Sequence, residues 1–407
     1  MSEATGLRLS RMGTAVGESA TLRQNALVAE LRATGRTIHN FTVGEPDCET
    51  PEVVRRAGHA ALDAGQTRYT PTAGIPELRA QIADSYTARH GMVWKPSQVV
   101  VSAGVKQVLW TALAALIEPG DEVVLFAPYW VSYSAYVRML GGVPRVVRAP
   151  ASRDYKATGE DLRAVLGPRT RVVLFNTPVN PTGAVYSRDE LRDLLEPLRA
   201  VDAVLITDEI YEDMVYGTEH VSPIQVLPDL ADRTLVASGA SKSFAMTGWR
   251  IGYGLGPEPL MRAMTNLQSH QTGNPSSISQ RGALAALRAS RAEVGHIPAL
   301  FRARRDVCLE ILRRYPEIHF PVPHGAFYLF LDVAPFFGTW RDGRRIDTSV
   351  QLAEHLLLEH GLAVVPGAAF DNETGIRVSY TLPEAELRVG LDRLATTLVR
   401  RGARADE

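Results

Sequence analysis

Apolar runs of strand length alternate with helical patterns through the middle of this chain. The runs are QVVVSAG (98–104), EVVLFAP (122–128), RVVLFNTP (171–178), AVLITDEI (203–210) and TLVASGA (234–240). Continuously apolar strands with helices between them indicate a parallel sheet that is covered on both faces. Right-handed crossovers make this an open α/β sheet, whose ligand crevice lies at the carboxyl ends of the strands.

The pattern changes after about residue 290. An Arg-rich helical stretch, EVGHIPALFRARRDVCLEILRRY (293–315), leads into HGAFYLFLDV (324–333), and short strands such as LAVVPG and GIRVSY follow. We therefore expect an α/β fold in two domains. Residues 51–290 form a large domain around a mainly parallel central sheet, and residues 1–50 and 291–407 form a smaller α+β domain.

Composition narrows the class of protein. The 407 residues are 45% hydrophobic and 22% charged, with a net charge of −1, so no overall field attracts nucleic acid or anionic lipid. No run approaches the ~18 apolar residues of a membrane helix, and the N-terminus lacks the apolar core of a secretory signal. The two cysteines, Cys48 and Cys308, lie far apart in the sequence, which argues for a reducing compartment and against a disulfide framework or a zinc cluster. These features predict a cytoplasmic protein.

Lysine 242 lies in an unusual setting. The stretch SGASKSFAMTGWRIGYGLG (238–256) places Lys242 among small residues, with Arg250 eight positions later. A lysine at a solvated surface needs no such setting. A lysine that forms a Schiff base does, because it needs a small-walled pocket and a lowered basicity.

Other candidate residues fall at the ends of the predicted strands. Asp208 ends the run at 203–210 with Tyr211 three residues on, and Asn180 lies in the turn NTPVNPTG. Gly104 precedes a helix whose first backbone N–H groups could hold a phosphate, although one glycine is a weak signal. Trp130, just after another strand, could stack on a planar ring. Taken singly, Asp208 could equally be a helix cap and Trp130 a core residue.

Together these residues match the needs of pyridoxal phosphate. Its pyridine nitrogen keeps a proton beside a buried carboxylate, and its aldehyde condenses with a lysine. Its phenolic oxygen takes hydrogen bonds, its ring takes a stacking face, and its phosphate takes backbone N–H groups and an arginine. A nucleotide-binding α/β protein without this cofactor is the plainer alternative.

The chain resembles the class I aminotransferases among the fold-type-I pyridoxal-phosphate enzymes, and within them the bacterial aspartate aminotransferase branch. The resemblance covers most of the chain. Its motifs, in the family's order, are VGEPDCETP (43–51), RYTPTAGIPELR (68–79), PYWVSY, NPTGAVY, DEIYE, SKSFAMTGWRIGY and GIRVSY.

The resemblance implies a role for each residue around the cofactor ring. Lys242 forms the Schiff base with pyridoxal phosphate, and Asp208 pairs with the pyridine nitrogen. Tyr211 and Asn180 bond the phenolic oxygen, and Trp130 stacks on the ring.

It also implies how the phosphate is held. Arg250 and the backbone of Gly104, Val105 and Lys106 bind it, and Tyr69 reaches it from a second subunit, so we expect a homodimer with shared active sites. Two positions depart from the family pattern. Gly239 stands where relatives often carry a serine that contacts the phosphate, and Val105 stands where they often carry a smaller residue.

For the substrate, the resemblance implies that Arg377 grips the α-carboxylate in a two-pronged pair and that Gly44 offers its backbone N–H. Trp130 and Asn180 contact the same substrate. The expected activity is a ping-pong transfer of the amino group of an α-amino acid to a 2-oxo acid, in amino-acid metabolism or biosynthesis. A lyase, cyclase or oxidase with the same cofactor is the alternative. A non-enzymatic amino-acid sensor is disfavoured because Lys242 is present.

The substrate side chain is less defined. LQSHQTGNP contains no arginine before its Asn-Pro, and VKQVLWTALAALI offers no lysine beyond Lys106. Trp110, Thr21 and His270 are then the candidate contacts, in a roomy and weakly cationic pocket. On this basis we expect aspartate to be at best one of several donors.

Overall fold

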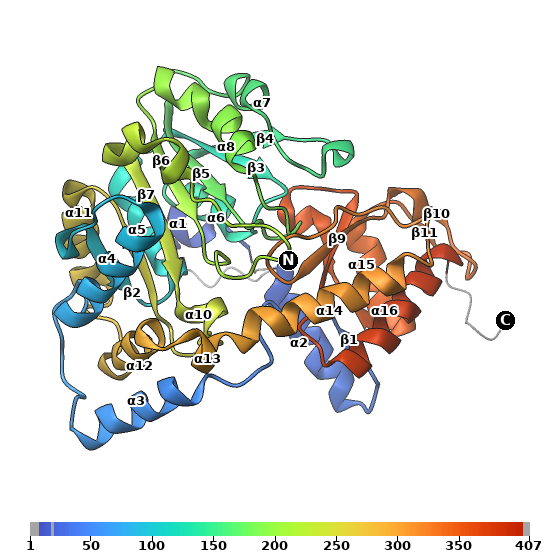
Figure 1. Cartoon of the computed structure of the whole chain (residues 1–407). Helices are drawn as coiled ribbons and strands as arrows, with labels where there is room; N and C mark the ends of the chain where they lie inside the picture. Colours follow the sequence, from blue (N-terminus) through green and yellow to red (C-terminus); the bar gives the residue numbers. More distant parts are fainter. Residues whose placement is uncertain (1–7, 18–19, 402–407) are drawn as a thin grey trace.

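A seven-stranded sheet forms the centre of the computed structural model, which describes residues 8–17 and 20–401 (Figure 1). The strand order is β2-β8-β7-β6-β5-β3-β4. The strands are β2 (Val99–Ser102), β3 (Glu122–Ala127), β4 (Val143–Arg148), β5 (Thr170–Asn176), β6 (Val204–Asp208), β7 (Thr234–Gly239) and β8 (Gly252–Leu255). Within this sheet β8 alone runs against the others, since it pairs antiparallel with both β7 and β2. The expected mainly parallel sheet is confirmed.

All five strands predicted from apolar runs are present, and the pattern missed two others. β4 is an edge strand in which five of the six residues are exposed or half-exposed, and it lacks a continuous apolar run. β8 is short and contains two glycines. A Cβ on Gly252 would lie 2.3 Å from the backbone nitrogen of Val105, so only glycine allows β8 to lie this close to the start of the helix that begins at Val105.

Both faces of the sheet are buried under helices. Val172 and Leu174 of β5 belong to one apolar cluster, whereas the alternating Val173 and Phe175 belong to another on the opposite face. The helices of this region are α3 (Glu52–Asp63), α4 (Pro76–His90), α5 (Val105–Leu116), α6 (Ser132–Met139), α7 (Gly159–Arg163), α8 (Arg188–Leu195), α9 (Pro223–Val226), α10 (Ala240–Ser243), α11 (Glu258–Gln271) and α12 (Ser277–Arg288).

The C-terminal part is built on a smaller antiparallel sheet of order β13-β14-β9. Its strands are β9 (Tyr328–Asp332), β13 (Val365–Pro366) and β14 (Gly375–Ser379), and its helices are α14 (His296–Leu312), α15 (Ser349–His360) and α16 (Glu384–Val399). The Arg-rich stretch is thus helical, as predicted. α14 runs between this part and the large sheet region (Figure 1).

The N-terminal segment joins the C-terminal part. Its α2 (Ala20–Ala33) and β1 (His39–Asn40) lie against that part, whereas α1 (Arg11–Thr14) contacts α6 of the large sheet region. β1 pairs in parallel with β12 (Leu362–Ala363), and Val28 of α2 packs with Leu357 of α15. Two ends of the chain that are far apart in sequence therefore share one structural unit.

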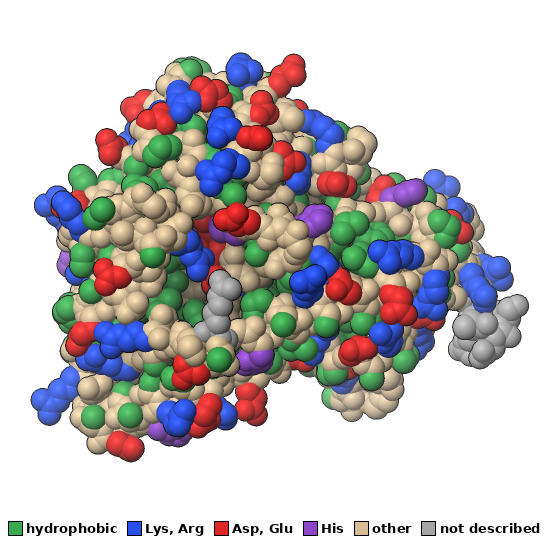
Figure 2. All heavy atoms as spheres, viewed as in Figure 1, with side chains coloured by type: hydrophobic (Ala, Val, Ile, Leu, Met, Phe, Trp, Pro, Cys, Tyr) green, Lys and Arg blue, Asp and Glu red, His purple; other side chains and the backbone are tan. Residues whose placement is uncertain are grey.

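Charged side chains of both signs are interspersed over the face shown in Figure 2. In the part of the chain that the structure describes, no helix combines the length and the apolar character needed to cross a bilayer.

Candidate active site

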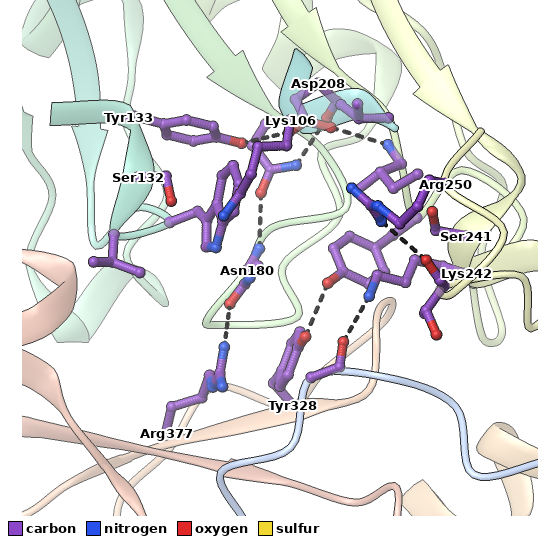
Figure 3. A pocket seen from close by; sticks show the side chains of 18 residues that line it. Lys106, Ser132, Tyr133, Asn180, Asp208, Ser241, Lys242, Arg250, Tyr328 and Arg377 are labelled. Carbon is purple, nitrogen blue, oxygen red and sulfur yellow. Dashed lines mark hydrogen bonds between the residues drawn. The ribbon is translucent and has the colours of Figure 1, made fainter. Parts of the chain in front are cut away.

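A cavity of about 310 Å³ opens at the carboxyl ends of the large sheet, at the low end of the range for small-molecule sites. Ten of the twelve site residues predicted from the sequence line it: Gly44, Val105, Lys106, Trp130, Asn180, Asp208, Tyr211, Lys242, Arg250 and Arg377. Figure 3 labels six of them, and their side chains converge on one space from the large sheet region and from β14. Gly104 lies directly beside the cavity as the N-cap of α5. Tyr69 points away from the body of this chain and is 97% exposed.

Lys242 lies in α10, directly after β7, and its Nζ donates a hydrogen bond to the carbonyl of Gly44 over 2.6 Å. Burial lowers the pKa of Lys242 to about 8, and the positive charges of Arg377 and Arg250 act in the same direction. A substantial fraction of this amine is therefore neutral near physiological pH, which both imine chemistry and proton abstraction require.

Asp208 is the last residue of β6 and is buried beneath the cavity. It accepts hydrogen bonds from the Tyr133 hydroxyl (2.7 Å) and the Ile210 backbone N–H (3.2 Å). Burial raises the pKa of Asp208 to about 6, against the effect of these hydrogen bonds. A cationic group in the cavity would stabilise the ionised carboxylate.

Arg377 is 3% exposed and points into the cavity from β14. Its Nη1 donates to Asn180 Oδ1 (3.2 Å) and its Nη2 to the carbonyl of Thr42 (2.9 Å). No carboxylate among the described residues forms an ion pair with it, and its Nε has no hydrogen-bond partner there. An unpaired buried guanidinium is costly, so the site is suited to an anionic ligand.

The N-terminus of α5 and Arg250 form the opposite end of the cavity. Gly104 has φ of +86°, and a Cβ there would lie 2.5 Å from Arg250 Nη2, so the glycine leaves room for the guanidinium. Arg250 itself adopts a left-handed conformation with φ of +58°, which a residue other than glycine takes only under tertiary constraint. Helix N–H groups beside an arginine are a suitable site for a phosphate.

The two departures from the family pattern lie against each other. A Cβ on Gly239 would lie 2.8 Å from both the Gly252 Cα and the Ile251 carbonyl, and 3.2 Å from a methyl group of Val105. A serine at 239 would not fit this backbone without a shift. Ser241 lines the cavity instead.

These residues match the donor set that pyridoxal phosphate requires. The cavity holds a lysine of lowered pKa, a buried carboxylate, a tyrosine, an aromatic ring and, at its far end, an anion site made of helix N–H groups and an arginine. Gly104 allows the Arg250 guanidinium to lie against the N-terminus of α5, where both can meet a phosphate.

Comparison with known proteins gives the same result. The family described as "Aminotransferase class I and II" matches residues 36–394. The chain belongs to this family. It is 41% identical over 382 residues to an aspartate/prephenate aminotransferase of Cereibacter sphaeroides, covering 93% of this chain and 96% of that protein. It is 40% identical to an aspartate aminotransferase of Rhizobium meliloti, covering 94% of each.

Solved structures of relatives agree closely with the fold. An aspartate aminotransferase from Rhizobium meliloti gives a TM-score of 0.93 at 39% identity, over 97% of this chain and 100% of that one. The enzyme from Thermus thermophilus with maleate gives 0.90 at 40% identity, over 96% and 99%. The chain is thus a fold-type-I aminotransferase that uses pyridoxal 5′-phosphate. Nothing in these comparisons supports the lyase alternative.

Sequence reasoning missed several residues of the aminotransferase site. Tyr133 bonds Asp208, Thr42 bonds Arg377 through its carbonyl, and Tyr328 bonds the Tyr211 hydroxyl. Tyr133 follows Trp130 within PYWVSY, so the motif itself was a signal for it. The contacts of Tyr328 and Thr42 depend on strand pairing and had no local signal.

Two of the three expected contacts to the substrate side chain do not line the cavity of this chain. Trp110 packs edge-on against Tyr136 at 5.7 Å between ring centroids, and His270 is exposed near the end of α11. The third, Thr21, lies in α2, but its side chain is outside what the structure describes. We expected Lys106 to contribute only its backbone N–H, but its side chain also lines the cavity.

One cluster of the described residues has the composition of a metal site, namely Glu209, Glu212 and His220 beyond Asp208. Its oxygens already have protein partners. Glu209 accepts from His220 (2.7 Å) and Ser222 (2.6 Å), and Glu212 pairs with Arg89 (2.6 Å). These contacts make the cluster a buried ionic network that supports the loop after β6.

Proposed function

We propose that this aminotransferase takes a dicarboxylic amino acid such as aspartate as its donor. The observation that carries the proposal is the pair of cations in the cavity. Arg377 is buried with no carboxylate partner among the described residues, and Lys106 has neither an ion pair nor a hydrogen bond there. The names of the relatives, which pair aspartate with prephenate, support a substrate with two carboxylates, as does the Thermus structure with maleate.

Lys106 supplies the charge for the second carboxylate. Its Nζ lies 5.2 Å from the centre of the Trp130 ring, on the wall of the cavity (Figure 3). Burial lowers the pKa of this amine, and Arg250 lowers it further. A carboxylate beside Lys106 would therefore stabilise its charged form. This replaces the weakly cationic pocket that we expected from the sequence.

The α-carboxylate binds at the other end. The planar guanidinium of Arg377 can form a bidentate pair with a carboxylate, and its Nη1 is held by a hydrogen bond to Asn180 Oδ1. Because its oxygen faces Arg377, Asn180 can turn its amide N–H₂ toward the ligands. The backbone N–H of Gly44 is the third group at this end.

Lys242 moves the proton at the reacting carbon. Pyridoxal phosphate supplies an electron sink for the bond that breaks at Cα. Lys242 would hold the cofactor, and its neutral Nζ would take the Cα proton of the bound donor. Asp208 would hold the proton of the pyridine nitrogen, Tyr211 would bond the phenolic oxygen, and Trp130 would offer a stacking face to the ring. The Gly104–Lys106 backbone and Arg250 anchor the phosphate.

Lys106→Met tests the donor class. Methionine keeps the packing against Trp130 but removes the charge, so kcat/KM for aspartate should fall by roughly 10–100-fold, with less than ~3-fold change for a neutral donor such as alanine. Single-turnover absorbance changes with a panel of donors measure both. Lys95→Met, at an exposed position, is the matched control. An equal loss for aspartate and alanine would contradict the role of Lys106.

We also propose a homodimer in which Tyr69 completes the phosphate site of the partner. Support comes from the 97% exposure of this large aromatic side chain. Tyr69→Phe should weaken cofactor retention by ~10-fold, because a hydrogen bond to a charged phosphate is lost. Dialysis against cofactor-free buffer measures this, and sedimentation at assay concentration should give the dimer mass. A fully active monomer would refute the proposal.

We also propose assignments for the domain boundaries and the cellular compartment. The pairing of β1 with β12 supports a division into a large domain, 51–290, and a small domain made of 1–50 and 291–407. The two free thiols, Cys48 and Cys308, support the cytoplasm as the compartment. Independent unfolding of the two parts in calorimetry, and fractionation of cells, test these assignments.

A further inference from the structure

We propose that Tyr328 is a positioning residue of this reaction. Its ring supports Arg377, and its hydroxyl holds the hydroxyl of Tyr211. One side chain thereby joins the group that binds the substrate carboxylate to the group that bonds the cofactor. This inference rests on the roles proposed above for Arg377 and Tyr211.

The pairing of β14 with β9 brings Tyr328 to Arg377. Arg377 lies opposite Phe330, and Ser379 lies opposite Tyr328, so Arg377 and Tyr328 are diagonal neighbours on one face of the small sheet. Their contact therefore depends on the register, and a slip of one residue would turn Arg377 to the other face.

The guanidinium of Arg377 lies over an aromatic surface. Its central carbon is 4.4 Å from the centre of the Tyr328 ring and 5.1 Å from that of Phe370. Cation–π attraction is strongest where the cation is desolvated, as it is at this buried position. The two rings stabilise the charge without neutralising it, so Arg377 remains free to pair with a carboxylate.

The hydroxyl of Tyr328 makes the second connection. It lies 2.9 Å from the Tyr211 hydroxyl, and the two rings meet edge-on at 82° (Figure 3). Tyr328 is 1% exposed, and a buried phenol needs a hydrogen-bond partner. Tyr211 is the one recorded for it in the described part of the chain. When the Tyr211 hydroxyl donates a hydrogen bond to a ligand, the Tyr328 hydroxyl can donate one to the Tyr211 oxygen. This second hydrogen bond strengthens the one from Tyr211 to the ligand.

Gly44 leaves the space that this arrangement needs. A Cβ on Gly44 would lie 3.0 Å from the Tyr328 oxygen and 3.9 Å from Arg377 Nη2. The carbonyl of the same glycine accepts the Lys242 hydrogen bond. Tyr328 therefore lies where Arg377, Gly44 and Tyr211 meet.

Two substitutions in the holoenzyme separate the two contacts. Tyr328→Phe keeps the ring and removes the hydroxyl, so the pH midpoint of the visible absorption change of the bound cofactor should rise by ~0.5 unit. Binding of an unreactive monocarboxylate, such as propionate, should change less than ~2-fold. Tyr328→Leu removes the ring and should weaken propionate binding by ~10-fold.

A double-mutant cycle tests the link to Tyr211. In a Tyr211→Phe background, Tyr328→Phe should cause no further spectral shift, because the partner hydroxyl is already absent. Tyr380→Phe is the matched control. It removes a buried hydroxyl that bonds the Ala326 carbonyl outside the cavity, so it should leave both readouts unchanged. Thermal unfolding monitors the fold of each variant.

The outcomes distinguish this inference from the proposed function. If Arg377→Lys and Tyr211→Phe alter propionate binding and the spectrum, but both Tyr328 variants behave as wild type, the inference about Tyr328 is wrong. If Arg377→Lys does not change propionate binding and Tyr211→Phe does not change the spectrum, the proposed roles of Arg377 and Tyr211 are wrong. A spectral shift of equal size with and without the Tyr211 hydroxyl would also overturn the link.

Discussion

Lys242→Ala is expected to lower the rate of amino-group transfer by at least ~10⁴-fold, because the variant loses both the group that carries the cofactor and the base that moves the Cα proton. The visible absorption of the protein-bound cofactor should disappear with it. The affinity for the cofactor should fall by a smaller factor than the rate, because Arg250 and the N-terminus of α5 still offer their phosphate contacts. Absorption spectra and single-turnover assays measure these effects.

Peptide mapping after borohydride reduction identifies the attached lysine directly. The label should fall on the peptide that contains Lys242. The control is Lys106, the other lysine that lines the cavity, and a label there would overturn the assignment. Because the pKa of Lys242 is lowered to about 8, its amine should also be more reactive at pH 8 than those of surface lysines.

Asp208→Asn is expected to retain the cofactor and to slow the chemical step by roughly 10²–10³-fold. The amide is similar in shape to the carboxylate but carries no charge, so it cannot stabilise a protonated pyridine nitrogen. Burial raises the pKa of Asp208 to about 6, although its hydrogen bonds and the charge of Lys242 act in the opposite direction. A cationic ring nitrogen would bring that pKa down and keep the carboxylate ionised under assay conditions.

Rapid mixing with a donor amino acid measures the chemical step separately from binding. Tyr133→Phe is the matched control, because it removes one hydrogen bond from Asp208 but keeps the charge, and we expect a loss of only ~10-fold. Near-normal single-turnover rates in Asp208→Asn would mean that this residue only caps the loop after β6.

The large sheet was predictable from the sequence because its strands are buried on both faces. Such strands are continuous apolar runs, and five of the seven were recognised in this way. β4 and β8 were missed for physical reasons. An edge strand keeps polar residues on its solvent side, and β8 contains glycines that are needed for close approach to α5.

The local motifs identified most of the residues that line the cavity. Lys242, Asp208, Asn180 and the start of α5 each follow a strand of one sheet, so the chain order alone brings them to a common edge. Motif order also identified Arg377 on β14. The chemistry of the site, and hence the family, was therefore encoded in short stretches of sequence.

Only the tertiary structure decided what surrounds these residues. The direction of the Lys106 side chain, the two rings beneath Arg377 and the pair of hydroxyls at Tyr211 and Tyr328 arise from contacts between distant segments. Trp110 and His270 have suitable chemistry but lie outside the cavity. The physical reason is that residue type and local pattern specify an element and its end, whereas side-chain direction and burial depend on the packing of elements far apart in sequence.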